Sequence, residues 1–395
     1  MVESALTRPG QRERYDNKIT QIDWVLVALL SCLAAIGVVI LYSISDRVGA
    51  NGQSGMNWEP WAYHQLIFYA FCTLLMLGMA LLDLRVWLAL CYPIYGFALL
   101  LLIAVAVHGA SHLGGRRWLD VGPISFQPSE IMKFALVMGL ARFYHETSAK
   151  AANFSWKLIF PLGMIGLPVA LVLKQPDLGT AVLIGLTGLT VMVLAGLNWK
   201  IIAAGGAAVV VAVPLAVPHL HGYQQRRILT FLNPENDPSG DGYHIIQSKI
   251  AMGSGGLLGK GLGLGSQSQL NFLPEKHTDF IMSAVCEDLG FAGGFVVLTL
   301  CAVIILMALR IASVSHSHFG RLAAAGVTAT FALHVLINGA MVMGLFPVVG
   351  VPMPLVSYGN SAMLMVMLGF GLVLGVRVHR YQELPRQASL FSRFE

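Results

Sequence analysis

Long apolar runs separated by short polar segments dominate the chain, and they recur ten times between residues 22 and 376. A helix needs about 20 apolar residues to cross a hydrocarbon core of roughly 30 Å. The sequence therefore predicts ten membrane-spanning helices, at 22–43, 61–82, 86–107, 129–144, 157–173, 179–197, 200–218, 284–309, 322–343 and 359–376. Because the runs are unbroken and do not alternate with polar residues, we expect an all-α polytopic membrane protein rather than a transmembrane barrel.

The apolar runs divide the chain into three parts: an N-terminal tail at 1–21, a membrane domain at 22–376 and a C-terminal tail at 377–395. The first run is too long for the apolar region of a signal peptide, so we expect it to stay as an uncleaved anchor. The longest connection, residues 219–283, contains apolar anchors and an amphipathic stretch near 242–252. We therefore expect an ordered cap on the helix bundle instead of a separate domain.

Composition and charge add an orientation to this picture. Hydrophobic residues make up 56% of the chain and charged residues only 11%, against roughly 25% charged in soluble domains. This excludes a soluble enzyme and a DNA-binding domain, and we expect no nucleic-acid partner. Lys and Arg gather in segments that are cytoplasmic if both termini are inside, whereas the short outer connections hold only Arg47, Arg116, Arg117 and Lys174. The polar segments 108–128, 174–178, 219–283 and 344–358 then lie on the outer face.

Two charged residues stand within the fourth predicted span. Glu130 and Lys133 are three residues apart and share one helix face, just after the helix-start signal of Pro128 and Ser129. Ionisable residues inside membrane segments are costly and are candidates for function. The pair predicts either an ion pair that orders the span or a polar cavity for a charged headgroup, and the spacing leaves both open.

Asp177 follows Pro176 between two apolar runs. Its position predicts an N-cap for the next helix, and the same carboxylate could face a cavity.

The segment 253–261 is rich in glycine and invites comparison with a nucleotide-binding loop. A Walker A loop needs Gly where the chain has Ser254, and Ser or Thr where it has Gly261. Glycine also permits close backbone approach to an anion. From spacing alone, a flexible loop is the better interpretation, and Lys260 within it is a candidate anion ligand.

The run 273–280 is the densest cluster of reactive side chains. It holds Glu275, Lys276, His277, Thr278 and Asp279, directly before the eighth predicted span. Partial desolvation at the membrane interface would make the Asp279 carboxylate more basic, as a general base requires. Thr278 or Asp279 could instead cap the following helix. Spacing does not choose between these interpretations.

Four stretches of motif occur in order along the chain: 115–118 with 127–133, 175–180, 242–279 and 350–359. Together they resemble the SEDS family (shape, elongation, division and sporulation proteins), and its RodA-type branch in particular. The segments 247–251 and 265–269 have the RodA form rather than the FtsW form. One position departs from the family pattern, since Asn360 stands where a second Gly usually follows Ser-Tyr-Gly.

The resemblance implies a peptidoglycan glycosyltransferase of the bacterial cytoplasmic (inner) membrane. Members polymerise lipid II, an undecaprenyl-pyrophosphate-linked disaccharide-pentapeptide, into glycan strands for cell elongation and rod shape. The implied partners are a class B, PBP2-type penicillin-binding protein that cross-links the product, other proteins of the elongation complex, and membrane lipids. The essential aspartate of the family corresponds to Asp279.

The implied chemistry assigns roles to the remaining candidates. An α-linked donor and a β1,4 product require one inverting displacement, with Asp279 taking the proton from the acceptor 4-hydroxyl. The leaving pyrophosphate needs positive charge, for which the candidate cations are Arg117, Lys133, Lys249 and Lys260. Glu130 would position Lys133, while Glu275 and His277 would support Asp279 or bind the sugar. A Mg²⁺ or Mn²⁺ ion could share the neutralisation, although spacing reveals no ligand set.

Other functions fit parts of the pattern. A flippase for lipid-linked precursors would also have intramembrane charges and Pro-broken helices, although the polarity here gathers on one face. A non-catalytic scaffold that recruits a cross-linking enzyme is a third class. A FtsW-type division polymerase is a variant of the first interpretation.

Overall fold

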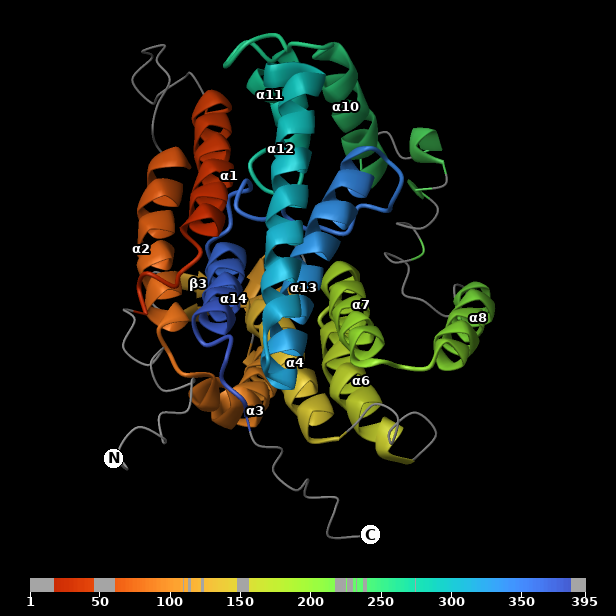
Figure 1. Cartoon of the computed structure of the whole chain (residues 1–395). Helices are drawn as coiled ribbons and strands as arrows, with labels where there is room; N and C mark the ends of the chain where they lie inside the picture. Colours follow the sequence, from red (N-terminus) through yellow and green to blue (C-terminus); the bar gives the residue numbers. More distant parts are fainter. Residues whose placement is uncertain are drawn as a thin grey trace, which may run out of the picture.

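The computed structural model describes residues 18–45, 61–108, 110–112, 115–121, 124–147, 156–216, 225, 230–231, 233–236, 240–273 and 275–384. Most of the two predicted tails, and parts of the connection 219–283, lie outside these residues. Within them, Figure 1 shows long helices packed side by side, with α10 and α11 at one end of the bundle and both chain termini toward the other end.

The elements follow one another along the chain without a long unstructured interruption in the described parts. The first half contains α1 (Trp24–Ser43), α2 (Ala62–Ala80), α3 (Leu84–His108), β1 (Ala110–His112), β2 (Gly115–Val121), β3 (Ile124–Phe126), α4 (Pro128–Glu146), η2 (Trp156–Leu158), α6 (Ile159–Lys174) and α7 (Leu178–Ala195). The second half contains α8 (Trp199–Ala216), η4 (Pro234–Asn236), α10 (Asp241–Ser254), α11 (Ser266–Gln269), α12 (Ile281–Val314), α13 (His318–Val342) and α14 (Asn360–Val378).

A helix occupies each of the ten apolar runs, and α10 occupies the predicted amphipathic stretch. Within the described residues, eight helices are long and apolar enough to cross a membrane. The chain is therefore a mostly helical, multi-pass membrane protein. Neither α4 nor α8 is among the eight, so ten spans with both termini in the cytoplasm stay a prediction.

The helix α4 lies at the centre of the bundle. It packs against α3, α6, α7 and α13, and most of its side chains are buried. A helix surrounded by protein does not face lipid, and its polar side chains can pair with those of neighbouring helices. This position explains why α4 carries Glu130 and Lys133 and is less apolar than the helices around it.

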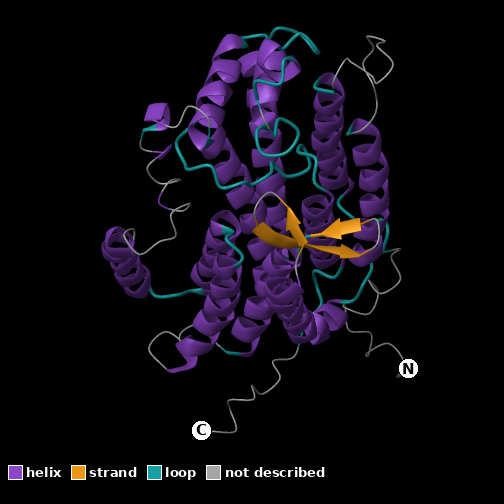
Figure 2. Cartoon of the chain, turned by 180° about the vertical axis from the view of Figure 1, so that it is seen from behind, coloured by secondary structure: helices purple, strands orange, loops and turns teal. Residues whose placement is uncertain are grey.

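A small antiparallel sheet connects α3 to α4, in the order β1-β2-β3. Ala110 pairs with Trp118, and Leu119 pairs with Phe126. Figure 2 shows the three strands lying against the helices on the side hidden in Figure 1. The sequence predicted an all-α protein with a polar connection here, so the sheet is a departure from that expectation. Strands this short give no clear alternating pattern in the sequence.

Side-chain caps and a glycine mark several helix ends. The carboxylate of Asp23 accepts the N–H of Leu26 at the start of α1, and the hydroxyl of Ser317 accepts the N–H of Gly320 at the start of α13. Gly196, with φ 103°, adopts the left-handed conformation that ends α7. These local signals fix where the polar connections leave the bundle.

The helix α12 is broken at Gly290, where φ is 70° and ψ is −166°. A break leaves N–H and C=O groups without helical partners, which is costly in lipid. The glycine-rich segment 255–261 supplies the missing partners. The N–H groups of Phe291 and Ala292 donate to the carbonyls of Gly256 and Leu257, and the N–H groups of residues 260 and 261 donate to the carbonyls of residues 287 and 288.

The glycines at this junction are required by close approach. A Cβ on Gly255 would lie 1.9 Å from the carbonyl oxygen of Cys286, and one on Gly259 would lie 2.1 Å from that of Asp288. A Cβ on Gly290 would lie 2.3 Å from the nitrogen of Gly259. The segment that resembled a nucleotide loop therefore approaches a helix break closely, and the expectation of a merely flexible loop is wrong.

Candidate functional site

The segment 275–280 is held in place by its backbone carbonyls. Those of residues 277, 278 and 279 accept hydrogen bonds from the N–H of Tyr358 at 2.8 Å, the Oγ of Ser357 at 2.6 Å and the Nδ2 of Asn338 at 2.8 Å, respectively. The same amide of Asn338 also donates to the carbonyl of Val351. The connection between α13 and α14 thereby fixes the backbone at Asp279.

The side chain of Asp279 is half-buried and lies beside Gly350. A Cβ on Gly350 would lie 3.4 Å from Oδ2 of Asp279, and the φ of 70° at Gly350 strains any other residue. The N-cap of α12 is Phe280, and no side chain caps this helix. The alternative role of Thr278 or Asp279 as its N-cap is therefore wrong.

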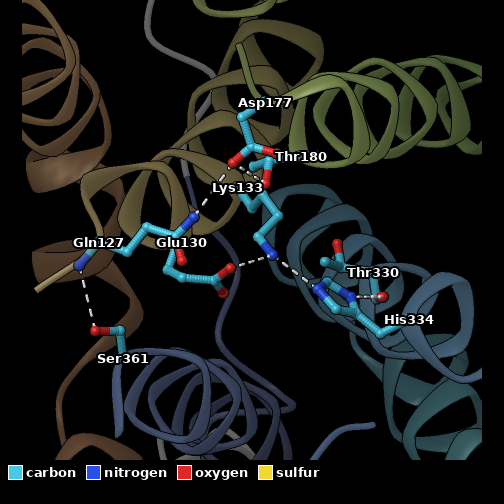
Figure 3. A network of polar contacts seen from close by, with 8 residues as sticks. All are labelled: Gln127, Glu130, Lys133, Asp177, Thr180, Thr330, His334 and Ser361. Carbon is cyan, nitrogen blue, oxygen red and sulfur yellow. Dashed lines mark hydrogen bonds and ion pairs between the residues drawn. The ribbon is translucent and has the colours of Figure 1, made fainter. Parts of the chain in front are cut away.

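A buried polar network lies at the start of α4 (Figure 3). The Nζ of Lys133 is 2.7 Å from Oε1 of Glu130 and 2.7 Å from Nε2 of His334, a residue of α13. The Nδ1 of His334 is 2.7 Å from the carbonyl oxygen of Thr330. The predicted pair of α4 exists, and it includes a histidine that the sequence analysis missed. An ionisable side chain inside an apolar run was the signal that could have revealed it.

Asp177 and Arg117 meet at the start of α7. Asp177 accepts the N–H of Thr180 at 3.2 Å and its hydroxyl at 2.8 Å, so the predicted N-cap is confirmed. The Nη2 of Arg117, on β2, donates to the carbonyl of Pro176 at 2.5 Å, and its Nη1 is 3.9 Å from Oδ1 of Asp177. The Nε2 of Gln127, just before α4, is 3.5 Å from Oδ2 of Asp177 and links this pair to the start of α4 (Figure 3).

A cavity of about 50 Å³ adjoins the Lys133 network. Its polar lining comes from Glu130, Lys133, Thr330 and His334, and apolar side chains of α4, α13 and α14 form most of the remainder with Pro352 and Pro354. This volume holds a few water molecules. The cavity thus joins a charged group to an apolar wall between three helices.

The two other candidate lysines have different surroundings. Lys249 is exposed on α10 with its Cε against Gly344, and it makes no hydrogen bond or ion pair within the described part of the chain. The Nζ of Lys260 lies 2.9 Å from Oε1 of Glu287, which is fully buried in α12. Glu287 also accepts the N–H groups of Gln267 and Ser268. Lys260 is thus part of an ion pair that anchors the glycine-rich segment to α12.

Glu275 and His277 lie on the same segment as Asp279. The Oε2 of Glu275 accepts the hydroxyl of Thr278 at 2.9 Å. The ring of His277 stacks on that of Trp61 with centroids 4.1 Å apart. Burial lowers the pKa of His277, and the neighbouring charge of Lys276 adds to this effect against the opposing charge of Glu275. The imidazole is therefore neutral at physiological pH.

The described residues include no group of three or more His, Cys, Asp and Glu side chains placed to hold a metal ion. Magnesium is often bound through only one or two carboxylates together with phosphates of a substrate. The expected divalent cation consequently has no assigned ligand in the protein.

Comparison with known proteins gives consistent matches over most of the chain. A family model described as "Cell cycle protein" (FTSW_RODA_SPOVE) matches residues 23–382. The chain is 45% identical over 311 residues to the protein named peptidoglycan glycosyltransferase MrdB of Escherichia coli K12, covering 78% of this chain and 82% of MrdB.

Solved structures agree in fold. A chain from a structure described as "Structural coordination of polymerization and crosslinking by a peptidoglycan synthase complex" aligns with a TM-score of 0.76 and 30% identity, over 91% of this chain and 99% of that chain. The rod shape determining protein RodA of Thermus thermophilus aligns with a TM-score of 0.67 and 28% identity, over 91% and 98% of the two chains.

Proposed function

The chain belongs to the FtsW/RodA/SpoVE family of cell cycle proteins, the SEDS family, and on that premise we propose that it is a peptidoglycan glycosyltransferase that polymerises lipid II with Asp279 as its general base. The observation that carries this proposal is the placement of Asp279. Its backbone is fixed by Asn338, and its carboxylate lies beside Gly350 at the start of α12.

The reaction is a single displacement at the anomeric carbon of the donor sugar. The 4-hydroxyl oxygen of the acceptor forms the new bond as the bond to the pyrophosphate breaks, and the carboxylate of Asp279 takes the hydroxyl proton. One displacement inverts an α-linkage to β, which matches the β1,4 product. The electron pair of the broken bond leaves with undecaprenyl pyrophosphate.

Positive charge must develop contacts with the leaving pyrophosphate. Arg117 and Lys249 are partly or fully exposed and are suited to first contact with a phosphate. Lys133 is buried at the cavity and is positioned by Glu130 and His334. Lys260 is engaged with Glu287, so its role is the anchoring of the glycine-rich segment.

A divalent cation remains part of the proposal as a companion of the substrate. It would enter with the pyrophosphate, whose oxygens supply ligands, and it would add charge neutralisation to that of the cationic side chains. Polymerisation measured with and without EDTA tests this requirement.

The topology proposed for this function has ten spans, both termini in the cytoplasm and the site on the outer face. The isoprenoid of the substrate then lies in the bilayer, and its sugars lie in water beside residues 240–280. The proposed partner is a class B penicillin-binding protein of the PBP2 type. The structural likeness to a chain of a peptidoglycan synthase complex supports this choice.

Purified lipid II provides the decisive assay. We expect wild-type protein in detergent to make glycan strands, alone or with its penicillin-binding protein, and Asp279→Asn and Asp279→Ala to make none while keeping the wild-type melting temperature. Asp83→Asn, a carboxylate between α2 and α3, is the matched control and should polymerise normally. Glycan synthesis by Asp279→Asn would overturn the assignment of the base.

The same assay separates the other candidate functions. Polymer formation in detergent cannot come from a flippase, because no bilayer separates two compartments. A scaffold would keep its function in Asp279→Asn as long as partner binding is intact. Lateral rather than septal location in cells distinguishes an elongation enzyme from a FtsW-type division enzyme.

A further inference from the structure

A second cavity adjoins the segment that carries Asp279. Its volume is about 260 Å³, close to the lower end of the roughly 300–1,000 Å³ typical of ligand pockets. It lies between Ile44 after α1, Trp61 before α2, and the stretch 271–277. It shares no lining residue with the cavity beside Lys133. The two cavities therefore offer different environments near the same reactive segment.

Aromatic rings form one wall of this second cavity. Trp61 and His277 stack at 4.1 Å with an angle of 19° between their planes, and Tyr358 meets Trp61 edge-on at 5.0 Å. The pKa of His277 is lowered by burial, so the stacked pair is uncharged at neutral pH. Flat, neutral rings of this kind suit the C–H faces of a sugar, because one side of a pyranose is apolar while its hydroxyls point outward.

Polar groups stand at the rim of the same cavity. The exposed carboxylate of Glu275 can accept sugar hydroxyls in addition to that of Thr278. Asn271 and Glu275 both have left-handed backbones, with φ of 57° and 51°. Such strain in a non-glycine residue is typical of functional positions. The rim thus combines hydrogen-bonding groups with the apolar side chains of Ile44 and Leu273.

The charge in this cavity fits a neutral ligand better than a phosphate. Its one lining cation is Lys276, which is 8% exposed. The Nζ of Lys276 donates to the carbonyl of Ser268 at 2.7 Å and to Oδ1 of Asn271 at 2.7 Å. An ammonium held in this way is poorly placed to neutralise a pyrophosphate, whereas sugar hydroxyls need no such charge.

We propose that the cavity between Trp61 and residues 271–277 is a carbohydrate subsite that binds a sugar ring of the glycan strand, apart from the lipid-linked pyrophosphate. The proposal rests on the proposed function, since it extends the same site. His277 and Asp279 are two residues apart, so their backbones are separated by at most about 7 Å. A ring stacked on Trp61 and His277 therefore lies near the reacting sugars and holds the strand between successive additions.

The test uses the full chain in detergent with Asp279→Asn, which prevents turnover. A lipid-free, uncross-linked hexasaccharide of alternating N-acetylglucosamine and N-acetylmuramic acid is titrated by calorimetry. We expect Trp61→Ala to weaken its binding about tenfold or more, which corresponds to the loss of one ring-stacking contact. Trp61→Phe should weaken it less, and Glu275→Gln, an exposed and nearly isosteric change, should weaken it several-fold. Trp156→Ala, an exposed tryptophan at the start of η2, is the control and should bind like the parent.

Two further readouts make the result decisive. Undecaprenyl pyrophosphate should not displace the hexasaccharide, and Glu275→Gln with Asp279 intact should make shorter strands at a similar initial rate of lipid II use. Equal hexasaccharide binding by the parent, Trp61→Phe and Glu275→Gln would overturn the subsite, as would competition by undecaprenyl pyrophosphate or absence of binding to the parent. Polymerisation by Asp279→Asn would instead overturn the proposed base and leave the binding result standing.

Discussion

The ammonium nitrogen of Lys133 lies 2.7 Å from Nε2 of His334, across the packed faces of α4 and α13. Lysine only donates, so Nε2 accepts, and Nδ1 carries the proton that is donated to the carbonyl of Thr330. The imidazole is neutral in this arrangement. Glu130 and His334 take two of the three N–H groups of Lys133, which leaves one donor for a ligand in the adjoining cavity.

Replacing Lys133 separates the structural role of this network from a catalytic one. Lys133→Met leaves the buried carboxylate of Glu130 unpaired, which should cost about 3–5 kcal/mol of stability. The double variant Glu130→Gln/Lys133→Met removes both charges and should recover most of the melting temperature. We expect it to remain strongly impaired in lipid II polymerisation, since the cation is absent. A double variant with near wild-type activity would show that the pair only orders α4.

Lys260 should behave in the opposite way. Lys260→Met exposes fully buried Glu287 to the loss of its charge partner, with an expected cost of about 3–5 kcal/mol. Lys260→Met/Glu287→Gln should restore the melting temperature together with polymerisation. The KM for lipid II in the double variant should match that of the wild type. A large rise in KM at normal stability would instead make Lys260 a substrate ligand.

The junction between the glycine-rich segment and α12 gives a paired stability test. Gly290→Ala places a Cβ 2.3 Å from the nitrogen of Gly259 at a φ of 70°, and we expect it to cost about 2–4 kcal/mol. Gly253→Ala, in the helix α10 with open space around its Cα, should stabilise by about 0.5–1 kcal/mol. Thermal unfolding in detergent measures both, and equal effects would contradict the described packing.

Acidification should weaken the segment around His277. Its pKa is lowered from 6.5 by burial, so above pH 6.5 the imidazole is neutral in both the folded and the unfolded chain. As the pH falls below that value, the unfolded chain binds the proton first, and folded stability declines. We expect the melting temperature of the wild type to fall more steeply than that of His277→Phe between about pH 7 and pH 5. Parallel curves would exclude this histidine as the titrating group.

The helices were predictable because long apolar runs have few alternatives, and the cap role of Asp177 followed from its place before such a run. The break in α12 was not predictable, since Gly290 looks like any glycine in an apolar helix until the segment 255–261 is placed beside it. The contact of Lys133 with His334 joins positions about two hundred residues apart, and spacing along one sequence carries no information on such pairs. The sheet that brings Arg117 to Asp177 was missed for the same reason.

The break in α12 also imposes an order on the assembly of the protein. The segment 255–261 is synthesised before α12 and supplies the partners for the backbone groups left open at Gly290. If the proposed topology holds, this segment must cross the bilayer before α12 can settle, because its open backbone groups are costly in lipid. Translocation of a soluble-looking loop thus becomes a precondition for inserting the helix that follows Asp279. Variants that slow export of residues 240–280 should accumulate with α12 unintegrated.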